Sequence, residues 1–340
     1  MSYKIIKKLP PTDEIISQTP LSDNGYNSIE KHRNEIKDIL AGRDNRLLLI
    51  VGPCSAWPYD AVLDYAARLV KLNEQYKDKV KLVMRVYIQK PRTVKGWTGP
   101  VNQPDPLLPA DIAKGIVYAR SLMVKVVEIG LPIADEALFT HNARGFLELL
   151  SWVAIGARSA EDQEHRIFAS SIDCPVGMKN PTHGSLKIGV NGVIAAQHPH
   201  VVVFDGYEVE TDGNLFAHLV LRGGDGKPNY GVAYIAEAAK YLKAGEVANP
   251  SIIVDVSHDN CLVNGKKDYK AQPNIVLQVL DSLEQSPSEL KSLIKGFMLE
   301  SFIKPGNQNA ETANLLDMGG LSITDPCLGW DETRQQPLRL

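Results

Sequence analysis

The sequence predicts an α/β protein of the (β/α)8 TIM-barrel class, with an N-terminal extension and a β-hairpin insertion after strand six. Three observations favour this fold: eight short apolar runs, amphipathic stretches between them, and a chain of 340 residues without a low-complexity linker. Eight βα units in roughly 300 residues suit a closed barrel better than an open doubly wound sheet. We expect residues 1–44 to form the extension, as an oligomer contact or regulatory segment, and residues 45–340 to form the barrel.

The extension begins with a Pro-rich segment at Leu9–Pro11 and contains a predicted helix over Asn27–Leu40. From Arg46 onward, each short apolar run is followed by a polar loop and then by an amphipathic stretch, a pattern typical of a parallel sheet. The predicted strands are Leu47–Val51, Val80–Val86, Pro132–Ala134, Trp152–Ile155, Pro175–Met178, Val201–Phe204, Ile252–Val256 and Ile294–Leu299.

Helices are predicted where apolar residues recur every three or four positions between these strands. After strand six, Tyr207–Leu221 alternates polar and apolar residues around Thr211-Asp212-Gly213-Asn214, which predicts the added hairpin. The predicted helices of the barrel are Ala61–Leu72, Ala110–Ile129, Arg144–Leu150, Leu186–Ala196, Val232–Ala244 and Ile275–Leu283.

Composition and charge exclude several classes of protein. Lys plus Arg number 37 and Asp plus Glu 40, so the net charge of −3 argues against a nucleic-acid-binding protein, which needs an excess of basic residues. The longest apolar runs are far shorter than the roughly 20 residues that span a bilayer, so no membrane span is predicted. The first residues, Met-Ser-Tyr-Lys-Ile-Ile-Lys-Lys, lack the apolar core of a secretory signal, and we therefore expect a cytoplasmic protein.

The four cysteines, Cys54, Cys174, Cys261 and Cys327, are widely spaced and form no Cys-x-x-Cys motif. This spacing argues against a zinc ribbon or a disulfide framework. At least one of them is a candidate for a lone functional thiolate.

Charged residues follow the predicted strands, at the end where the reacting groups of such barrels lie. The cations would converge on one mouth, which indicates an anionic substrate with several charges, because Arg captures carboxylate or phosphate bidentately and Lys adds a point charge. The alternative is that each cation is a solvated surface residue or half of an ion pair. The six cations are Arg85, Lys90, Arg92, Arg158, Lys179 and Arg222.

A second set at the strand ends combines soft and hard metal ligands. Cys54, His258, Glu300 and Asp325 offer a thiolate, an imidazole and two carboxylates, which suit Mn²⁺, Fe²⁺, Co²⁺ or Zn²⁺ without choosing among them. The alternative treats Cys54 as a small core residue and His258 as a loop histidine, since 204 positions separate the two.

Longer motifs surround these residues, and in their order along the chain they resemble those of a known family. The family is the type I 3-deoxy-D-arabino-heptulosonate 7-phosphate (DAHP) synthases, of the type regulated by aromatic amino acids, and the resemblance extends over about Leu9 to Trp330. The motifs are Gly52-Pro53-Cys54-Ser55, Lys90-Pro91-Arg92-Thr93, Gly156-Ala157-Arg158, Leu221-Arg222-Gly223-Gly224, Ser257-His258, Glu300-Ser301 and Ser322-Ile323-Thr324-Asp325.

The resemblance implies a metal-dependent transferase. Its members condense phosphoenolpyruvate with D-erythrose 4-phosphate and water to give DAHP and phosphate, in an aldol-type reaction that is the first step of the shikimate and aromatic amino acid pathway. It also implies one divalent metal ion (Mn, Fe, Co or Zn) and a homodimer or homotetramer in which the N-terminal extension reaches a neighbouring subunit.

The resemblance further implies a role for each matched residue. Cys54, His258, Glu300 and Asp325 are the expected metal ligands. Lys90, Lys179 and His258 are the expected catalytic residues, and Lys179 or Lys90 is a general acid if neighbouring cations lower its pKa. The expected phosphoenolpyruvate residues are Arg85, Lys90, Glu136, Ala157, Arg158, Lys179 and Arg222, and the expected erythrose 4-phosphate residues are Lys90, Pro91, Arg92 and Thr93.

Some positions depart from the family pattern. Ala56-Trp57-Pro58 stands where Ile-His-Asp is usual, which puts an indole near the metal, and Pro181-Thr182-His183-Gly184 replaces Gly-Thr-Asp-Gly. Asp135 stands where Gly is common. The hairpin is shorter than in feedback-inhibited members, and Asp173 replaces a small residue of the effector pocket. We therefore expect weak or no inhibition by Phe, Tyr or Trp.

Two alternative functions stay open. The same phosphoenolpyruvate chemistry can act on another aldose phosphate, in a variant synthase of a secondary pathway or in an eight-carbon 3-deoxy-octulosonate phosphate synthase. Lys90-Pro91-Arg92-Thr93 favours erythrose 4-phosphate over the eight-carbon route, whose enzymes carry Lys-Ala-Asn-Arg-Ser. The second alternative is an inactive homologue that acts as a regulatory binding partner.

Overall fold

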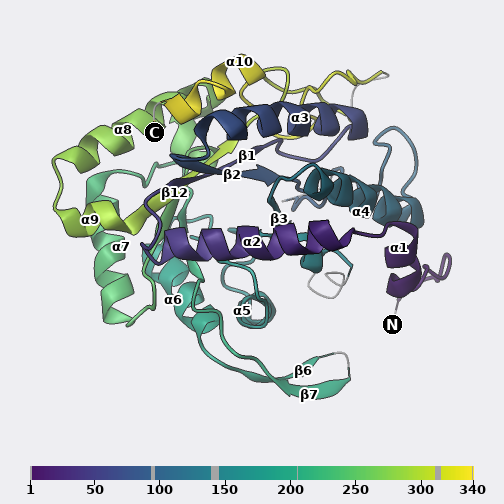
Figure 1. Cartoon of the computed structure of the whole chain (residues 1–340), viewed down its shortest axis with the longest axis horizontal. Helices are drawn as coiled ribbons and strands as arrows, with labels where there is room; N and C mark the ends of the chain where they lie inside the picture. The colour runs from purple at the N-terminus through teal and green to yellow at the C-terminus, as the bar shows by residue number, and fades with distance from the viewer. Residues whose placement is uncertain (1, 93–95, 139–144, 205, 311–314, 339) are drawn as a thin grey trace.

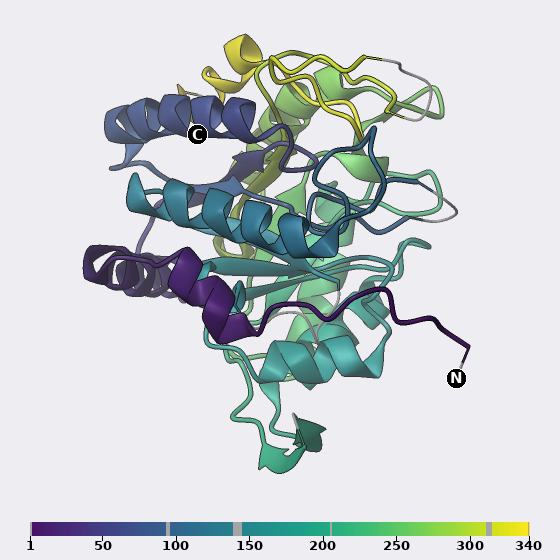
Figure 2. The same cartoon turned by 90° about the vertical axis from the view of Figure 1, so that its right-hand side faces the viewer.

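Eight parallel strands close into a barrel, which confirms the predicted fold class (Figures 1 and 2). The computed structural model describes residues 2–92, 96–138, 145–204, 206–310, 315–338 and 340. The last strand pairs with the first in register, so that Gly52 lies opposite Glu300. In ring order the strands are β1 (Leu47–Gly52), β2 (Val80–Arg85), β3 (Ile133–Ala137), β4 (Trp152–Ile155), β5 (Val176–Lys179), β8 (His218–Leu221), β9 (Ile252–Asp255) and β12 (Ile294–Glu300).

Alternation along the strands divides the core into two layers. In β1, Leu48 and Ile50 belong to the cluster that fills the barrel, whereas Leu49 and Val51 belong to the larger cluster under the helices. Successive side chains of a strand point to opposite faces, so both faces must be apolar when both are buried. This is why the strands read as continuous apolar runs in the sequence.

The same alternation determines which side chains enter the mouth of the barrel. Val83, Val220, Ile253 and Met298 are all members of the interior cluster near the carboxyl ends of their strands. The residue two positions later on each strand points the same way. These next inward positions are Arg85, Arg222, Asp255 and Glu300, and the corresponding positions on β3 and β5 are Glu136 and Lys179.

Helices surround the barrel, as predicted for βα units (Figure 1). Asp111, Asp162 and Ser185 cap α4, α5 and α6, because each side chain accepts a backbone N–H in the first turn of its helix. The helices are α3 (Tyr59–Tyr76), α4 (Ile112–Glu128), α5 (Gln163–Ser170), α6 (Leu186–Gln197), α7 (Val232–Ala244), α8 (Gln272–Glu284), α9 (Ser288–Leu293) and the short α10 (Trp330–Thr333).

The N-terminal segment contains α1 (Thr12–Gln18) and α2 (Asp23–Leu40), the second of which includes the predicted helix. Ile36, Ile39 and Leu40 of α2 belong to the interior cluster, so this helix covers the end of the barrel opposite the mouth. A polar network also attaches it, since the ammonium of Lys81 contacts both His32 and Glu35.

Strand six of the barrel is β8, and the prediction that placed it at Val201–Phe204 is wrong. Those residues form β6 (Val201–Phe204), which pairs antiparallel with β7 (Tyr207–Glu210) in a hairpin that projects from the body (Figures 1 and 2). The insertion therefore precedes strand six, and Tyr207–Leu221 is not one hairpin. An apolar run resembles a buried strand whether or not other elements cover it, and here Val203 is 81% exposed.

Other short elements differ from the prediction. The expected helix Arg144–Leu150 begins outside the described residues, and its described part contains only a 3-10 turn over Leu147–Leu149. The helices α5 and α9 were not predicted, and neither was a two-stranded hairpin of β10 (Leu262–Val263) and β11 (Lys266–Lys267). Within the described part of the chain, no helix is both long and apolar enough to cross a membrane.

Candidate active site at the mouth of the barrel

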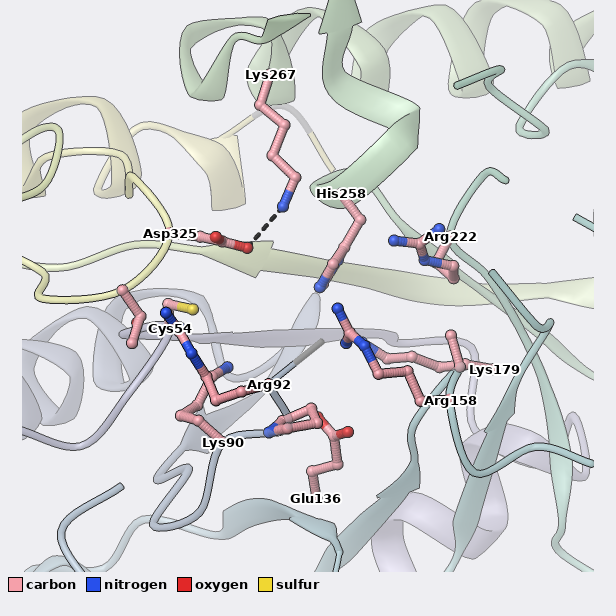
Figure 3. Close-up of a pocket in the computed structure, with 13 residues that line it drawn as sticks. Cys54, Lys90, Arg92, Glu136, Arg158, Lys179, Arg222, His258, Lys267 and Asp325 are labelled. Atoms are coloured by element: carbon pink, nitrogen blue, oxygen red, sulfur yellow. Dashed lines mark hydrogen bonds and ion pairs between the residues drawn. The ribbon is translucent and has the colours of Figure 1, made fainter. Parts of the chain in front are cut away.

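A cavity of about 330 Å³ opens at the carboxyl ends of the strands (Figure 3). Residues from strand ends that are far apart in the sequence line it together, as expected for the mouth of a parallel barrel. The lining residues are Cys54, Lys90, Pro91, Arg92, Glu136, Ala157, Arg158, Lys179, Arg222, His258, Lys267, Thr324 and Asp325.

Three of the four predicted metal ligands form one cluster. One ligand atom each of Cys54, Glu300 and Asp325 lies within 4.8 Å of the others. The pairing of β1 with β12 explains part of this arrangement, because Glu300 lies opposite Gly52, two residues before Cys54. A thiol and two carboxylates so close together are a suitable donor set for a divalent transition metal.

The charges around this cluster act in opposite directions on its members. Burial and the negative charge of Glu300 raise the pKa of the Cys54 thiol to about 11. Burial opposes ionisation of Glu300 and Asp325, but nearby cations outweigh it and lower the pKa of each carboxyl. The groups that lower the pKa are His258 and Arg85 for Glu300, and first Lys267 and then His258 for Asp325.

His258 lies on the cavity wall, outside the cluster of three. It begins the 3-10 turn His258–Cys261 with φ of 55°, a left-handed conformation that few residues other than glycine adopt. Its Nδ1 lies 2.9 Å from Oδ2 of the buried Asp255 and 2.7 Å from the Ser257 hydroxyl. Burial lowers the pKa of His258 despite the charge of Asp255. Asp255 therefore fixes the orientation of the ring.

Most of the predicted cations converge on the cavity. In Figure 3, Arg158, Lys179 and Arg222 lie on one side of it, and Cys54 and Asp325 lie on the other. Lys179 is buried and donates to Asp255 at 2.9 Å, and Arg222 pairs with Asp259 at 3.2 Å. A ligand with several anionic groups would be complementary in charge to these cations.

Arg85 lies beneath the cavity, outside the set of lining residues. Its side chain is completely buried, stacks on the ring of Tyr87, and donates to Glu300 at 3.0 Å. Among the described residues, its Nε and Nη1 have no hydrogen-bond partner. Buried donors without a partner are costly, so the guanidinium has capacity for a further anion.

Lys90, Pro91 and Arg92 line the cavity, and Thr93 lies outside the described residues. Burial lowers the pKa of Lys90, but the charges of Cys54 and Glu300 outweigh it, and the net shift is upward. The neighbouring cation Arg85 lowers the pKa of Lys90 by less than these acidic groups raise it. The role of Lys90 as a general acid stays a prediction.

Glu136 reaches the cavity because Gly156 leaves room for it. A Cβ at Gly156 would lie 2.0 Å from Oε1 of Glu136, a distance that no side chain can tolerate. Its neighbour Asp135 is buried and accepts hydrogen bonds from the N–H groups of Ile88 and Glu136. Burial raises the pKa of Asp135 to about 8. Asp135 therefore joins the loop after β2 to β3 next to the site.

Sequence reasoning missed Asp255, Lys267 and Thr324. Asp255 occupies the inward position two residues after Ile253. The alternation of inward and outward side chains along the strand could therefore have predicted that Asp255 enters the mouth of the barrel. Lys267 donates to Asp325 at 2.6 Å from the unpredicted β10–β11 hairpin, and the sequence carries no signal for it. Thr324 lies 3.0 Å from the Ser55 hydroxyl and joins the two loops that carry Cys54 and Asp325.

Comparison with known proteins identifies relatives over almost the entire length of the chain. Residues 19–336 match the sequence model of the DAHP synthetase I family. The chain is 39% identical over 339 residues to the Phe-sensitive phospho-2-dehydro-3-deoxyheptonate aldolase of Escherichia coli K12, covering 98% of this chain and 93% of the relative. It is 38% identical over 331 residues to the Trp-sensitive enzyme of Enterobacter agglomerans, covering 96% and 91%.

A solved structure agrees with these sequence relatives. The phospho-2-dehydro-3-deoxyheptonate aldolase of Francisella tularensis superposes with a TM-score of 0.91 at 33% sequence identity. The superposition covers 99% of this chain and 97% of that one.

Proposed function

The chain belongs to the DAHP synthetase I family, and from this premise we propose that it condenses phosphoenolpyruvate with D-erythrose 4-phosphate and water. The products are DAHP and phosphate, and the reaction is the first step of the shikimate pathway. One observation carries the proposal: a single cavity joins a set of metal-binding groups to a wall of cations. An enzyme that forms a C–C bond between two anionic substrates needs both.

We propose that Cys54, His258, Glu300 and Asp325 hold one divalent metal ion, with Mn, Fe, Co and Zn all compatible. The contact between Nδ1 of His258 and Asp255 supports its inclusion, because metal-binding histidines usually donate their other ring nitrogen to a carboxylate. Nε2 is then the ligand atom. When bound, the metal polarises the aldehyde as a Lewis acid.

Phosphoenolpyruvate is proposed to bind Arg158, Lys179 and Arg222, whose charges match its phosphate and carboxylate. The unpaired donors of Arg85 extend this set, and Lys90 lies where it can contact both substrates. We assign the remaining family roles to the backbone N–H near Ala157 and to Glu136 acting through water.

The phosphate of the aldose is proposed to bind the segment Lys90, Pro91, Arg92 and Thr93. Three of these residues line the same cavity as the phosphoenolpyruvate cations. Holding both substrates in contact removes much of the entropic barrier to their reaction.

In the proposed reaction, C3 of phosphoenolpyruvate attacks the aldehyde carbon, water adds at C2, and the C–O bond to phosphate breaks. Arg158 and Arg222 stabilise the departing phosphate, and Lys179 is the proposed general acid. Lys90 lines the same cavity and is the alternative candidate for the general acid. His258 contributes to catalysis as an oriented ligand.

We also propose a homodimer or homotetramer. The N-terminal extension and the β6–β7 hairpin support it, because both expose large apolar side chains; Ile6 is 91% exposed and Tyr207 is 71% exposed. The four buried free cysteines fit a reducing compartment, and we keep the cytoplasm as the proposed location.

The test uses purified, metal-supplemented protein with phosphoenolpyruvate and a panel of aldose phosphates, following the loss of phosphoenolpyruvate absorbance. We expect turnover with erythrose 4-phosphate, loss of turnover with a chelator, and recovery when metal is restored. Cys54→Ser should need far more metal for the same rate. Turnover with another aldose phosphate alone would favour the variant synthase, and no turnover with any aldehyde would favour the inactive binding partner.

A further inference from the structure

Two tryptophans pack together outside the set of residues that line the cavity. Trp57, Trp97, Leu316 and Ile323 form an apolar cluster separate from both layers of the barrel core, and we call it the two-tryptophan cluster. Each of the four residues is more than nine-tenths buried. None of them belongs to the set that lines the cavity, so the cluster supports the site from outside.

The cluster joins three loops, and each of them carries part of the proposed site. Trp57 follows Cys54 by three residues, and Ile323 precedes Asp325 by two. Trp97 belongs to the segment between β2 and α4, which also contains Lys90. The backbone N–H of Lys90 donates to the carbonyl of Thr98 at 3.0 Å, so the residue next to Trp97 holds Lys90 directly.

Both indoles donate hydrogen bonds to neighbouring carbonyls of the segment between β2 and α4. Nε1 of Trp97 donates to the carbonyl of Gln103 at 2.8 Å, and Nε1 of Trp57 donates to the next carbonyl, of Pro104, at 3.1 Å. A buried indole needs such a partner for its N–H, and these contacts therefore fix the direction of both rings. Trp57 thus attaches the β1 loop to the β2–α4 segment by packing and by a directed bond.

Apart from Lys90, the proposed phosphoenolpyruvate residues are held differently. Lys179 ends β5 and pairs with Asp255, and Arg222 follows β8 and pairs with Asp259. Among the described residues, the two-tryptophan cluster contains nothing from the loops after β4, β5 and β8. Loosening the cluster should disturb the aldose segment relative to the metal ligands and leave these cations in place.

We propose that Trp57 is a positioning residue that sets the spacing between the aldose-phosphate segment and the metal ligands, and thereby the length of acceptor that the enzyme accepts. This inference rests on the proposed function. An acceptor must place its phosphate at Lys90–Arg92 and its aldehyde at the ligands Cys54 and Asp325 at the same time. A fixed spacing selects the aldose phosphate whose length matches it, because reacting atoms must be placed to within about 1 Å.

The test compares Trp57→Phe, Trp57→Ala and the control Trp330→Phe. Phenylalanine keeps most of the packing but cannot donate to Pro104, and alanine removes both. Trp330 is a suitable control because it packs on Tyr65, with ring centroids 5.6 Å apart, outside the two-tryptophan cluster. The measurements are steady-state KM for erythrose 4-phosphate, for a shorter triose phosphate and for a longer pentose phosphate, and the Kd of phosphoenolpyruvate by calorimetry.

We expect Trp57→Ala to raise the KM for erythrose 4-phosphate by about tenfold or more. The difference in KM between erythrose 4-phosphate and the shorter and longer aldose phosphates should become smaller. Trp57→Phe should show a smaller rise. The Kd of phosphoenolpyruvate should change much less than the acceptor KM in all variants, because Lys90 is the one proposed phosphoenolpyruvate residue in the segment that the cluster holds. Equal weakening of both substrates, or unchanged acceptor KM and length preference in both Trp57 variants, would overturn the inference.

Amide hydrogen exchange tests the positioning role of Trp57 independently of the proposed function. If the wild-type protein consumes no acceptor, the proposed function fails, but amide exchange over residues 96–104 still reports the positioning. Exchange there should increase in Trp57→Ala, less in Trp57→Phe and not in Trp330→Phe. Exchange over residues 176–186, which span β5 and the loop that follows it, should stay unchanged. Wild-type exchange at 96–104 in both Trp57 variants would contradict the positioning role.

Discussion

Lys179 and Asp255 form an ion pair of 2.9 Å inside the mouth of the barrel, and Asp255 is shared between the two parts of the proposed site. The same carboxyl oxygen lies 2.9 Å from Nδ1 of His258. Burial opposes ionisation of Asp255, but His258 and Lys179 outweigh it and keep its pKa well below the usual value. One carboxylate therefore orients both a proposed metal ligand and a proposed general acid.

We predict that Asp255→Asn weakens metal binding by about tenfold to a hundredfold, because the carboxylate that orients the His258 ring loses its charge. Turnover at saturating metal should also fall, since Lys179 loses its ion partner. Competition with a metal-sensitive chelator dye measures the affinity. Asp281→Asn, an exposed carboxylate on α8, is the control. Wild-type metal affinity in Asp255→Asn would show that Asp255 does not support the metal site.

Lys267 is predicted to act on the metal site through Asp325, to which it donates at 2.6 Å. Lys267→Met frees that carboxylate to rotate, and we expect metal affinity to fall by about tenfold. The neighbouring Lys266→Met is a matched control on the same exposed hairpin, and Lys267→Arg should retain part of the affinity. A higher affinity in Lys267→Met would mean that the ammonium competes with the metal instead of orienting its ligand.

The fold class could be predicted because burial on two faces leaves a clear pattern in the sequence. Leu48 and Ile50 fill the barrel while Leu49 and Val51 meet helices, and such a strand cannot be polar on either side. The convergence of Lys90, Arg158, Lys179 and Arg222 on one cavity followed from their positions after strands. The parallel topology brings all such positions to one end.

The parts that could not be predicted depend on tertiary context. Val201–Phe204 has the composition of a core strand, but nothing among the described elements covers it, so only the structure distinguishes β6 from β8. Lys267 reaches Asp325 from a hairpin whose strands have two residues each. Such strands are too short to show an alternation of polar and apolar residues in the sequence. The upward shift in the pKa of Lys90 depends on Cys54 and Glu300, which are distant in the sequence.

Feedback inhibition is predicted to be weak or absent, although relatives are named for their sensitivity to Trp or Phe. The β6–β7 hairpin has strands of only four residues, and Asp173 is an exposed carboxylate between α5 and β5. Initial rates with each aromatic amino acid test this expectation, and an Asp173→Ser variant tests the role of the carboxylate. Strong inhibition of the wild-type enzyme by micromolar Phe would refute it.

The last prediction concerns acid stability and rests on His218, a buried residue at the start of β8. Its Nε2 accepts a hydrogen bond from Nε1 of Trp152 at 3.1 Å, and its Nδ1 lies 2.9 Å from the carbonyl of Phe216. Only the neutral ring with hydrogen on Nδ1 satisfies both partners. Burial lowers the pKa of His218 to about 4.

Between pH 6.5 and about 4, His218 takes up a proton in the unfolded chain but not in the folded one. Stability should therefore fall as the pH falls through this window, with a contribution from His218 on the order of 3 kcal/mol. Urea unfolding of wild type, His218→Gln and the exposed control His198→Gln across the window isolates this contribution. The His218→Gln variant should lose stability less steeply than the other two, because its amide does not titrate. Equal slopes in all three proteins would mean that the acid sensitivity of the barrel originates elsewhere.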